Sequence, residues 1–493
     1  MKTLLKTFLI LYLFTVTSCE KTPIEPMLEV NVQDDINYFI WKGLNVFYYW
    51  QEEVPDLADN RFGTFNELYT YFRNFTEPET VFENLLNRPE DRFSVIVDDY
   101  IRLENSFQGL NLSNGIEFGL VRYKTLTNNV FGYVRYVVQN SDAASKNITR
   151  GQLFTTINGQ QLTENNFRTL LFSENTTYTM GFADYNNGDP IDNGDFVTLE
   201  KTDLQENPIA IHKTIEVNNQ KIGYFMYNQF ASNYDAELNA VFSNFKAQNI
   251  NDLIIDLRYN PGGSTKTAIY LGSMITGQFT DMVFSKELWN QKIRNANPPE
   301  LFINNFTNKI RNTDSNGSVL VEEPIKSLGL NRVYIITSSA TASASELVIN
   351  ALSAYIDVKL VGAKTVGKQV GSLTLYDSDN LRKTGSNFNT DHRYALQPLV
   401  LEITNKDNEN YPNGITPGIN ISGIELREDF ENLGILGAPS EPLLSRTLEY
   451  IITGAKENTN TKKQYFLNEI YDSKLATPAS NRMISEIIEF PLR

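Results

Sequence analysis

A serine inside a run of small residues, followed later by a lysine, could do chemistry in this chain. Residues 338–346 read Ser-Ser-Ala-Thr-Ala-Ser-Ala-Ser-Glu and lead into an apolar, helix-like stretch that ends at Ile356. This pattern places the hydroxyl of Ser343 at a helix N-terminus, where unpaired N–H groups and the dipole favour negative charge. Lys368 follows one predicted strand later. A lysine that takes the serine's proton would make a Ser-Lys dyad, a known variant of the activated serine.

The remaining candidate groups are few. The chain has only two histidines, His212 and His392, and neither lies near a serine or aspartate motif. If a serine is the nucleophile, we therefore expect lysine rather than histidine as its base. Ser338, Ser339 and Ser345 compete for the nucleophile's role. Ser345 lies one helical step deeper, and we interpret the small residues around it as close packing.

Three apolar stretches are the predicted strands that would position these groups. Residues 253–258 form a continuous strand that breaks into Asn260-Pro261-Gly262-Gly263, residues 333–337 precede the serine run, and residues 358–362 precede Lys368. Ligands bind outside the carboxyl ends of strands in α/β sheets. Glycines at such an end permit positive φ and a close approach of the backbone to a substrate.

Together these blocks resemble the signature sequences of the carboxyl-terminal processing (tail-specific) serine peptidases. The resemblance covers about residues 100–455. The matching blocks are Asp256-Leu257-Arg258, Asn260-Pro261-Gly262-Gly263, Thr341-Ala342-Ser343-Ala344-Ser345-Glu346, Gly367-Lys368, Tyr394-Ala395-Leu396-Gln397-Pro398, Gly414-Ile415 with Pro417, and Leu443-Leu444.

The resemblance implies an α/β catalytic domain (ClpP/crotonase-like) in which Ser343 is the nucleophile and Lys368 the general base. The backbone N–H of Ala344, with that of Gly262 or Gly263, would form the oxyanion hole. Each such donor supplies roughly 3–4 kcal/mol of transition-state stabilisation. Because a free lysine with a pKa of about 10.4 is protonated, the base must be desolvated to titrate near working pH.

One position departs from the family pattern. The family reads Gly-Lys-Gly-x-x-Gln, and the glutamine orients the lysine, whereas this chain has Ser372 in the glutamine's place. Three alternatives stay open: a weaker dyad, a substitute orienting residue such as Gln369 or Gln397, or an inactive relative.

Residues 105–203 change to short alternating strands with Gly and Asn turns and resemble a PDZ domain. Residues 141–151 resemble its short helix, and 152–159 resemble the strand that ends in Ile-Asn-Gly, with Gln152 where the family usually has aspartate. Phe118-Gly119-Leu120 resembles the loop whose N–H groups hold a peptide's terminal carboxylate, so we expect substrate to bind there. PDZ domains add the peptide as an edge strand. The alternative is a β-rich domain used only for packing.

The N-terminus predicts export. Lys2 and Lys6 precede an apolar run from Phe8 to Val16, a pattern typical of a secretory signal and too short to span a membrane. Cys19 is the only cysteine in 493 residues, and its position resembles the lipobox of bacterial lipoproteins. That resemblance implies acylation of Cys19, loss of residues 1–18 and a lipid anchor in the bacterial cell envelope, on the periplasmic or outer side of a membrane. The alternative is a plain signal peptide with an incidental cysteine.

Charge and composition narrow the partners. The net charge of −16 argues against nucleic acid and against charge-driven binding to an anionic membrane, so the lipid is the expected membrane tie. Two histidines and one exported cysteine form no ligand cluster, so we expect neither a metal nor another cofactor. The expected partners are protein or peptide substrates.

These interpretations combine into an expected organisation and function. The expected segments are a signal peptide at 1–18, a tether at 19–32, an N-terminal helical domain at 33–104, a PDZ-like domain at 105–203, a peptidase domain at 204–455 and an extension at 456–493 that has helix-like apolar spacing and docks on the body. The expected function is an exported Ser-Lys endopeptidase that recognises unstructured C-terminal tails. A catalytically silent peptide-binding protein and a non-peptidase serine hydrolase, such as an esterase, are the alternatives.

Overall fold

The computed structural model describes residues 31–455 except 127, 186–188 and 315, together with residues 469–480 and 482–485. Cys19 and the signal-peptide residues lie outside the described residues, so export and lipidation stay predictions. Within the described ranges, no helix is both long enough and apolar enough to cross a membrane.

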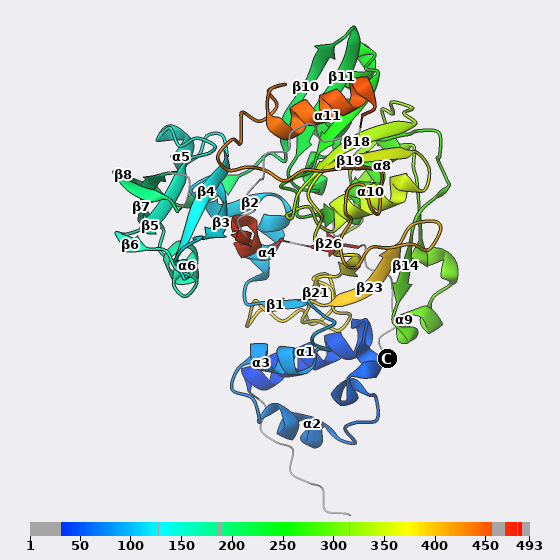
Figure 1. The fold of residues 1–493 in the computed structure, drawn as a ribbon. Coiled ribbons are helices and arrows are strands. Elements are labelled where there is room, and N and C mark those ends of the chain that lie inside the picture. The colour runs from blue at the N-terminus through cyan, green and yellow to red at the C-terminus, as the bar shows by residue number, and fades with distance from the viewer. Residues whose placement is uncertain are drawn as a thin grey trace, which may run out of the picture.

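Helices dominate the first part of the chain, which lies at the bottom of Figure 1. They are α1 (Val32–Phe47), η1 (Gln51–Glu53), η2 (Pro55–Leu57), α2 (Phe65–Phe72), α3 (Pro78–Asn84) and α4 (Tyr100–Phe107). Helix α1 begins after Asn31, whose side chain accepts a hydrogen bond from the N–H of Asp34. Strand β1 (Val95–Val97) then pairs with β22 (Ala395–Gln397), so this helical part is joined to the body by a sheet.

A six-stranded sheet forms the centre of the body. Its order is β10 (Ile209–Val217), β11 (Gln220–Tyr227), β12 (Asp252–Asp256), β18 (Arg332–Thr337), β19 (Asp357–Gly362) and β24 (Gly423–Glu425). Strands β11 to β24 are parallel, and β10 is antiparallel to β11. The three predicted strands are confirmed as β12, β18 and β19. They read as continuous apolar runs because parallel sheets are covered on both faces.

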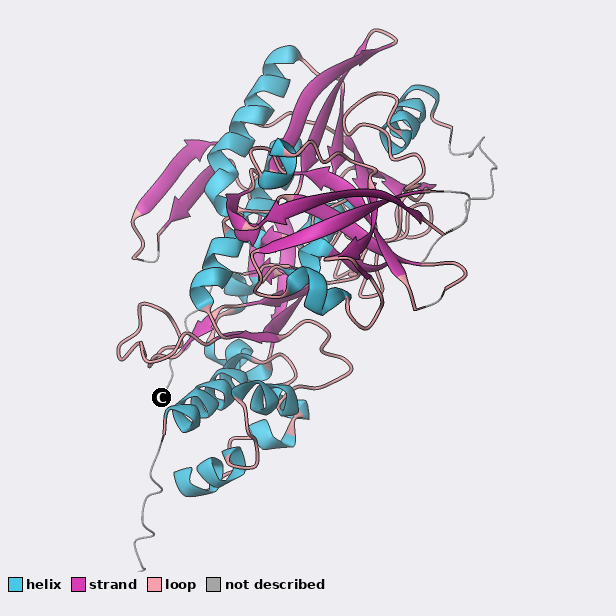
Figure 2. Ribbon diagram, turned by 90° about the vertical axis from the view of Figure 1, so that its left-hand side faces the viewer, coloured by secondary structure: helices cyan, strands magenta, loops and turns pink. Residues whose placement is uncertain are grey.

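Helices cover both faces of this sheet, as Figures 1 and 2 show. On one face, α7 (Asp235–Gln248), α8 (Thr265–Ile275) and α10 (Ala344–Ser353) share a hydrophobic core with side chains such as Ile255. On the other face, α11 (Pro442–Thr453) packs against a second core that contains Ile254. Successive residues of one strand therefore enter different cores, as the pleat requires.

A second six-stranded sheet lies beside the central one. Its order is β13 (Gly263–Ser264), β26 (Met483–Ile484), β20 (Val370–Ser372), β23 (Leu399–Thr404), β14 (Val283–Trp289) and β15 (Ile303–Asn305). Smaller elements complete the body: η3 (Ser232–Tyr234), α9 (Gln291–Ala296), η4 (Pro299–Phe302), β16 (Lys309–Thr313), β17 (Val319–Pro324) and β21 (Leu375–Tyr376). Residues 483–484, far along the chain, lie between a glycine-loop strand and the strand that contains Ser372.

Residues 110–205 form a separate β-rich domain, on the left in Figure 1. Its main sheet has the order β25 (Glu469–Asp472), β3 (Ile116–Arg122), β4 (Val130–Val137), β5 (Leu153–Ile157), β7 (Thr177–Asp184) and β8 (Ile191–Glu200). The remaining elements are β2 (Leu110–Ser113), β9 (Thr202–Gln205), β6 (Gln160–Gln161), α5 (Asp142–Ser145) and α6 (Phe167–Phe172). The predicted short helix is α5, and the predicted Asn-Gly turn follows β5 with positive φ at Asn158 and Gly159.

Two local predictions for this region are wrong. Phe118, Gly119 and Leu120 lie inside strand β3, paired on both sides, rather than in a carboxylate-binding loop. The glycine is needed there because a Cβ at Gly119 would lie 2.5 Å from the ring of Tyr133 on the neighbouring strand. Ile470 and Tyr471 belong to a strand, β25, rather than to a helix. The conformation of a short apolar segment is set more by pairing with a neighbouring sheet edge than by its own weak periodicity.

Candidate active site

The backbone of Ser343 bends sharply where the chain passes from β18 into α10. Its φ of 64° and ψ of −118° are unusual for a residue with a Cβ, and such strain is typical of functional positions. The side chain is buried, and its Oγ has no hydrogen-bond partner among the described residues. Ala344 is the first residue of α10, so its N–H belongs to the helix terminus that has no partner within the helix.

The carboxylate of Glu346 connects the serine to the lysine. One carboxylate oxygen, Oε2, accepts the backbone N–H of Ser343 and that of Lys368, each at 2.8 Å. The other oxygen accepts the Thr365 hydroxyl at 2.5 Å and the Gly367 N–H at 2.7 Å. Burial raises the pKa of Glu346, and these four donors oppose that rise. Because one oxygen atom binds both N–H groups, the two backbones must lie side by side.

Lys368 is fully buried, and its Nζ has no hydrogen-bond partner within the described ranges. Burial lowers its pKa well below the ordinary lysine value, and the nearby Arg482 guanidinium lowers it further. Asp91 and Glu346 act in the opposite direction. The ammonium lies 5.5 Å from the centroid of the Phe93 ring, which the N-terminal helical part contributes. Such desolvation favours the neutral amine that a general base requires.

In the glycine loop after β12, the backbone N–H of Gly263 points to a segment from near the C-terminus, whereas that of Gly262 bonds within the loop. The Gly262 N–H donates to the side-chain oxygen of Asn260 at 2.9 Å, whereas the Gly263 N–H donates to the carbonyl of Arg482 at 2.7 Å. Both glycines have positive φ, 109° and 139°. A Cβ at Gly262 would lie 2.6 Å from the Cβ of Ser343, so the loop touches the serine directly. Of the two predicted oxyanion donors, Gly263 is the one that already binds a peptide carbonyl.

The three candidate lysine-orienting side chains are all buried. Ser372 lies on β20, and its Oγ has no partner in the described part of the chain. Both polar atoms of the Gln369 side chain also lack a partner there, and Gln397 uses its amide nitrogen on Thr374 but leaves its oxygen unpaired. Buried polar atoms without partners are uncommon, and their concentration here is typical of a functional site.

The competing serines have structural partners. The Ser345 hydroxyl donates to the carbonyl of Asn260 at 3.1 Å, and the Ser338 hydroxyl donates to the carbonyl of Arg258. Ser339 is exposed. Ser345 therefore binds the glycine loop to α10, in agreement with its interpretation as a packing residue.

A buried ionic cluster lies at the start of the glycine loop, around Arg258. The Arg258 guanidinium pairs with Asp256 at 2.8 Å, Glu441 at 2.6 Å and Glu428 at 3.0 Å. Arg150 of the β-rich domain also pairs with Glu428, at 2.6 Å. The cluster joins β12, α11 and the β-rich domain, because each buried charge needs a partner.

Three contributors to the site were not singled out from the sequence. Glu346 could have been found, because a serine followed three positions later by glutamate is the pattern of a capping box. Phe93 and Arg482 come from distant parts of the chain and carry no local signal. Among the described residues, no group of three or more His, Cys, Asp or Glu side chains could hold a metal ion.

The chain is similar in sequence to known bacterial serine proteases. A carboxyl-terminal-processing protease of Picosynechococcus sp. is 27% identical over 172 residues, which are 35% of this chain and 35% of that protein. A Staphylococcus epidermidis protein described as a probable CtpA-like serine protease is 28% identical over 194 residues, which are 38% of this chain and 35% of that protein. This chain thus spans about a third of the length of the curated relatives it matches.

A solved structure has the same fold. The crystal structure of a Bacteroides fragilis protein assigned to the S41 proteases superposes with a TM-score of 0.61 at 23% identity, over 84% of this chain and 97% of that one. Two family models match separate parts of the sequence: Peptidase family S41 over residues 221–419 and Peptidase S41 N-terminal domain over residues 35–95. The chain thus matches this peptidase family in two separate stretches, one in the N-terminal helical part and one in the body.

Proposed function

We propose that this chain is a serine endopeptidase in which Ser343 is the nucleophile and Lys368 the general base. The observation that carries the proposal is the Glu346 carboxylate, which binds the N–H groups of both residues through one oxygen atom. The Ser343 hydroxyl and the Lys368 amine are both buried, and neither has a hydrogen-bond partner among the described residues. A static site often shows such groups apart, since catalytic hydrogen bonds tighten when substrate binds.

The proposed reaction begins when neutral Lys368 takes the proton of the Ser343 hydroxyl and Oγ attacks the scissile carbonyl carbon. The carbonyl oxygen becomes an oxyanion that the N–H groups of Gly263 and Ala344 stabilise. The C–N bond breaks as the lysine returns the proton to the leaving amine. Water then hydrolyses the acyl-enzyme by the same base, so that the serine is regenerated.

The proposal extends to substrate recognition and location. We propose that the β-rich domain is PDZ-like and presents unstructured C-terminal tails of protein substrates to the site. It is supported by the pairing of β3 with the short edge strand β25, which extends the sheet as an added peptide strand would. We also propose that the chain is exported and anchored by a lipid on Cys19 in the cell envelope.

Labelling and turnover test the proposal. A fluorophosphonate probe should label the purified protein, and Ser343→Ala should abolish both the labelling and the cleavage of an unstructured polypeptide. Ser339→Ala, which removes an exposed hydroxyl in the same small-residue run, is the matched control and should keep both. Cleavage by Ser343→Ala at the wild-type rate would remove the assignment.

Two results would favour the alternatives. A folded wild-type protein that neither takes the label nor cleaves peptides would point to the silent peptide-binding protein. Labelling of Ser343 with turnover of esters but not of peptides would point to a non-peptidase hydrolase.

A further inference from the structure

One segment of the chain reaches from the β-rich domain to the catalytic site. We name the described residues 469–480 and 482–485 the return segment. Its first part is strand β25, at the edge of the β-rich sheet, followed by η5 (Ser473–Ala476). Its last part is strand β26, between the glycine loop and the strand of Ser372. The same stretch therefore contacts both places where a substrate is proposed to bind.

At the β-rich domain, the return segment lies where an added peptide strand would lie. Strand β25 is antiparallel to β3, with Tyr471 opposite Leu120 and Asp472 opposite Gly119. The Tyr471 ring also packs against helix α6, with ring centroids 5.1 Å from Phe167 and 5.3 Å from Phe172. The segment thus fills a groove between β3 and α6, with backbone pairing on one side and aromatic contact on the other.

A buried arginine adds charge recognition at the same sheet edge, on the face opposite α6, where it lies beside Tyr133 and Tyr259. The side chain of Arg135, which is 3% exposed, pairs with Asp472 at 2.6 Å and also with Glu469. Without these two carboxylates the guanidinium would be a buried charge without acidic partners among the described residues, which is costly. The sheet edge therefore suits an extended segment that carries an aromatic ring towards α6 and carboxylates on the opposite face.

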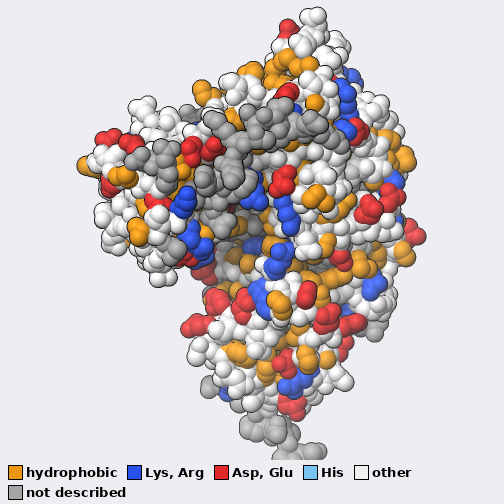
Figure 3. Space-filling model, in the orientation of Figure 1, with side chains coloured by type: hydrophobic (Ala, Val, Ile, Leu, Met, Phe, Trp, Pro, Cys, Tyr) orange, Lys and Arg blue, Asp and Glu red, His pale blue; other side chains and the backbone are white. Residues whose placement is uncertain are grey.

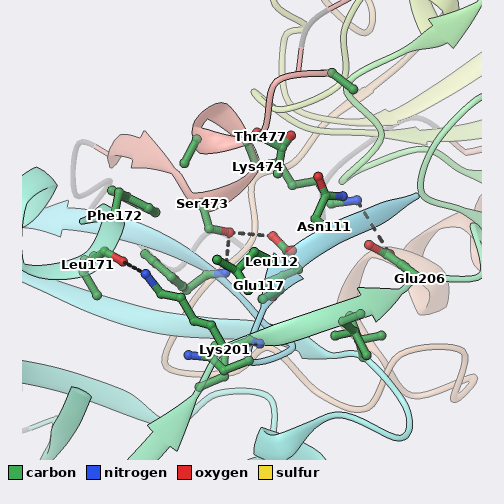
Figure 4. Close-up of a pocket in the computed structure, with 18 of the residues that line it drawn as sticks. Asn111, Leu112, Glu117, Leu171, Phe172, Lys201, Glu206, Ser473, Lys474 and Thr477 are labelled. Atoms are coloured by element: carbon green, nitrogen blue, oxygen red, sulfur yellow. Dashed lines mark hydrogen bonds and ion pairs between the residues drawn. The ribbon is translucent and has the colours of Figure 1, made fainter. Parts of the chain in front are cut away.

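The turn after β25 closes the groove and borders a cavity. The Ser473 hydroxyl accepts the Phe118 N–H at 2.9 Å and donates to the carboxylate of Glu117 at 2.6 Å, as Figure 4 shows. The adjoining cavity of about 440 Å³ extends from Phe172 of α6 to Pro261 of the glycine loop. Figure 3 shows a hollow between the β-rich domain and the rest of the molecule, with Lys and Arg side chains around it. The cavity gives an extended chain a path from the groove to the glycine loop.

At the catalytic end, the return segment uses the groups that a substrate would need. The carbonyl of Arg482 accepts the Gly263 N–H at 2.7 Å, and its guanidinium donates to the carbonyl of Phe93 at 2.7 Å, beside Lys368. The carbonyl of Ile484 accepts the Thr265 hydroxyl at 3.0 Å, and the N–H of Ser485 donates to the carbonyl of Ser372 at 3.2 Å. A polypeptide substrate cannot pair with this loop while the segment occupies it.

We propose that the return segment is an intramolecular ligand of both the β3–α6 groove and the catalytic cleft, and that a substrate reaches Ser343 only after displacing it. The substrate that does so carries an aromatic residue and a carboxylate at the positions of Tyr471 and Asp472. This inference rests on the proposed function for its catalytic part, since it concerns access to the same serine.

The chain direction makes the segment an occupant rather than a substrate. A tail held by the groove at its C-terminus would be cut on the N-terminal side of the residues in the groove. In the return segment the groove residues 469–472 precede the residues at the glycine loop, 482–485. The return segment therefore runs from the groove to the catalytic cleft in the chain direction opposite to that of a substrate held by its C-terminus.

Peptide binding to the full chain tests the proposal. The background is Ser343→Ala, which prevents turnover, and the probe is a fluorescent peptide with the sequence of residues 469–480. Replacing Tyr471 by Ala and Asp472 by Asn in the chain removes the ring contact and one ion pair of the internal ligand. We expect the probe to bind this variant at least about tenfold more tightly than the background, because the groove is free for a larger fraction of the time.

Controls separate recognition from general loosening. Leu475→Ala changes a side chain of the same segment that is 43% exposed, and it should leave the probe's affinity unchanged. A probe peptide with the same Tyr and Asp replacements should bind at least about tenfold more weakly than the original probe. Equal affinity of the original probe for background and variant, or the lack of saturable binding to a folded variant, would overturn the proposal.

A second measurement needs no change in the return segment. In the Ser343→Ala background, added probe should increase hydrogen exchange at the amides of residues 483–485, because displacement from the groove draws the segment out of the cleft. Unchanged exchange at saturating probe would overturn the coupling of the two sites. Both measurements are independent of turnover, so they decide this inference even if Ser343 proves unreactive. Labelling of Ser343 without probe binding would leave the proposed function standing and remove this inference alone.

Discussion

Replacing Glu346 by glutamine tests whether one buried carboxylate positions both halves of the catalytic site. One of its oxygens accepts the N–H groups of Ser343 and Lys368, and the other accepts the Thr365 hydroxyl and the Gly367 N–H. A glutamine has the same shape, but one oxygen becomes an NH₂ donor. Whichever way the amide is turned, two of the four buried donors lose their acceptor.

The structure sets the size of the effect. Each buried donor without a partner costs about 1–3 kcal/mol, so the free energy of unfolding should fall by about 2–6 kcal/mol. Because the same contacts hold the nucleophile and the base, a displacement of about 1 Å should reduce kcat/KM by about 100-fold. The carboxylate also raises the pKa of Lys368 against the burial that lowers it. Its removal should therefore move the rising limb of the pH–rate profile to lower pH.

Urea unfolding and initial rates of peptide cleavage from neutral to alkaline pH measure these effects. Glu425→Gln, an exposed carboxylate on β24, is the matched control and should change neither quantity. Wild-type stability with an unmoved pH profile would refute the reasoning. If the variant is less stable but its pH–rate profile and the cleavage rate of its folded fraction are unchanged, Glu346 has only a structural role.

The other predictions concern single positions. Lys368→Arg and Lys368→Ala should both abolish turnover, because arginine cannot act as a neutral base, and the wild-type rate should rise with pH through one ionisation below the ordinary lysine pKa; a flat pH–rate profile would contradict the dyad. Ser372→Gln should preserve or raise kcat/KM if Ser372 occupies the orienting position, and a collapse of activity in a folded variant would show a different orienting residue. Burial raises the pKa of Glu428, but two buried arginines bring it down to about 2, below its ordinary 4.5. Its stabilising contribution is therefore complete above its unfolded-state pKa and is lost as pH falls towards 2, so Glu428→Gln should flatten the acid limb of the unfolding free energy against pH. Cys19→Ala should release the protein from the membrane fraction, and fractionation in which the variant stays membrane-bound would point to another anchor.

The local sequence was sufficient to predict the strands and the glycine loop, because these depend on neighbouring residues. The stretches at 253–258, 333–337 and 358–362 are apolar throughout, and a strand covered on both faces has to be so. The pair Gly262-Gly263 ends the first of them because the loop passes so close to Ser343 and Phe230 that no Cβ fits. By contrast, the prediction of a loop at Phe118-Gly119-Leu120 was wrong. A glycine between apolar residues fits a turn, but it equally fits a strand position where an aromatic ring of the neighbouring strand leaves no room for a Cβ.

The amino-acid sequence by itself determined which serine, lysine and glycines of this chain belong to one kind of site, because each is carried by a strand and the loop that follows it. Only the tertiary structure decided what surrounds them: Phe93 over the Lys368 amine, and the return segment against Gly263 and Ser372. Pairing at a sheet edge uses main-chain N–H and C=O groups that every residue has. Which distant segment fills that edge therefore leaves little trace in residue types and is set by where the folded chain can reach.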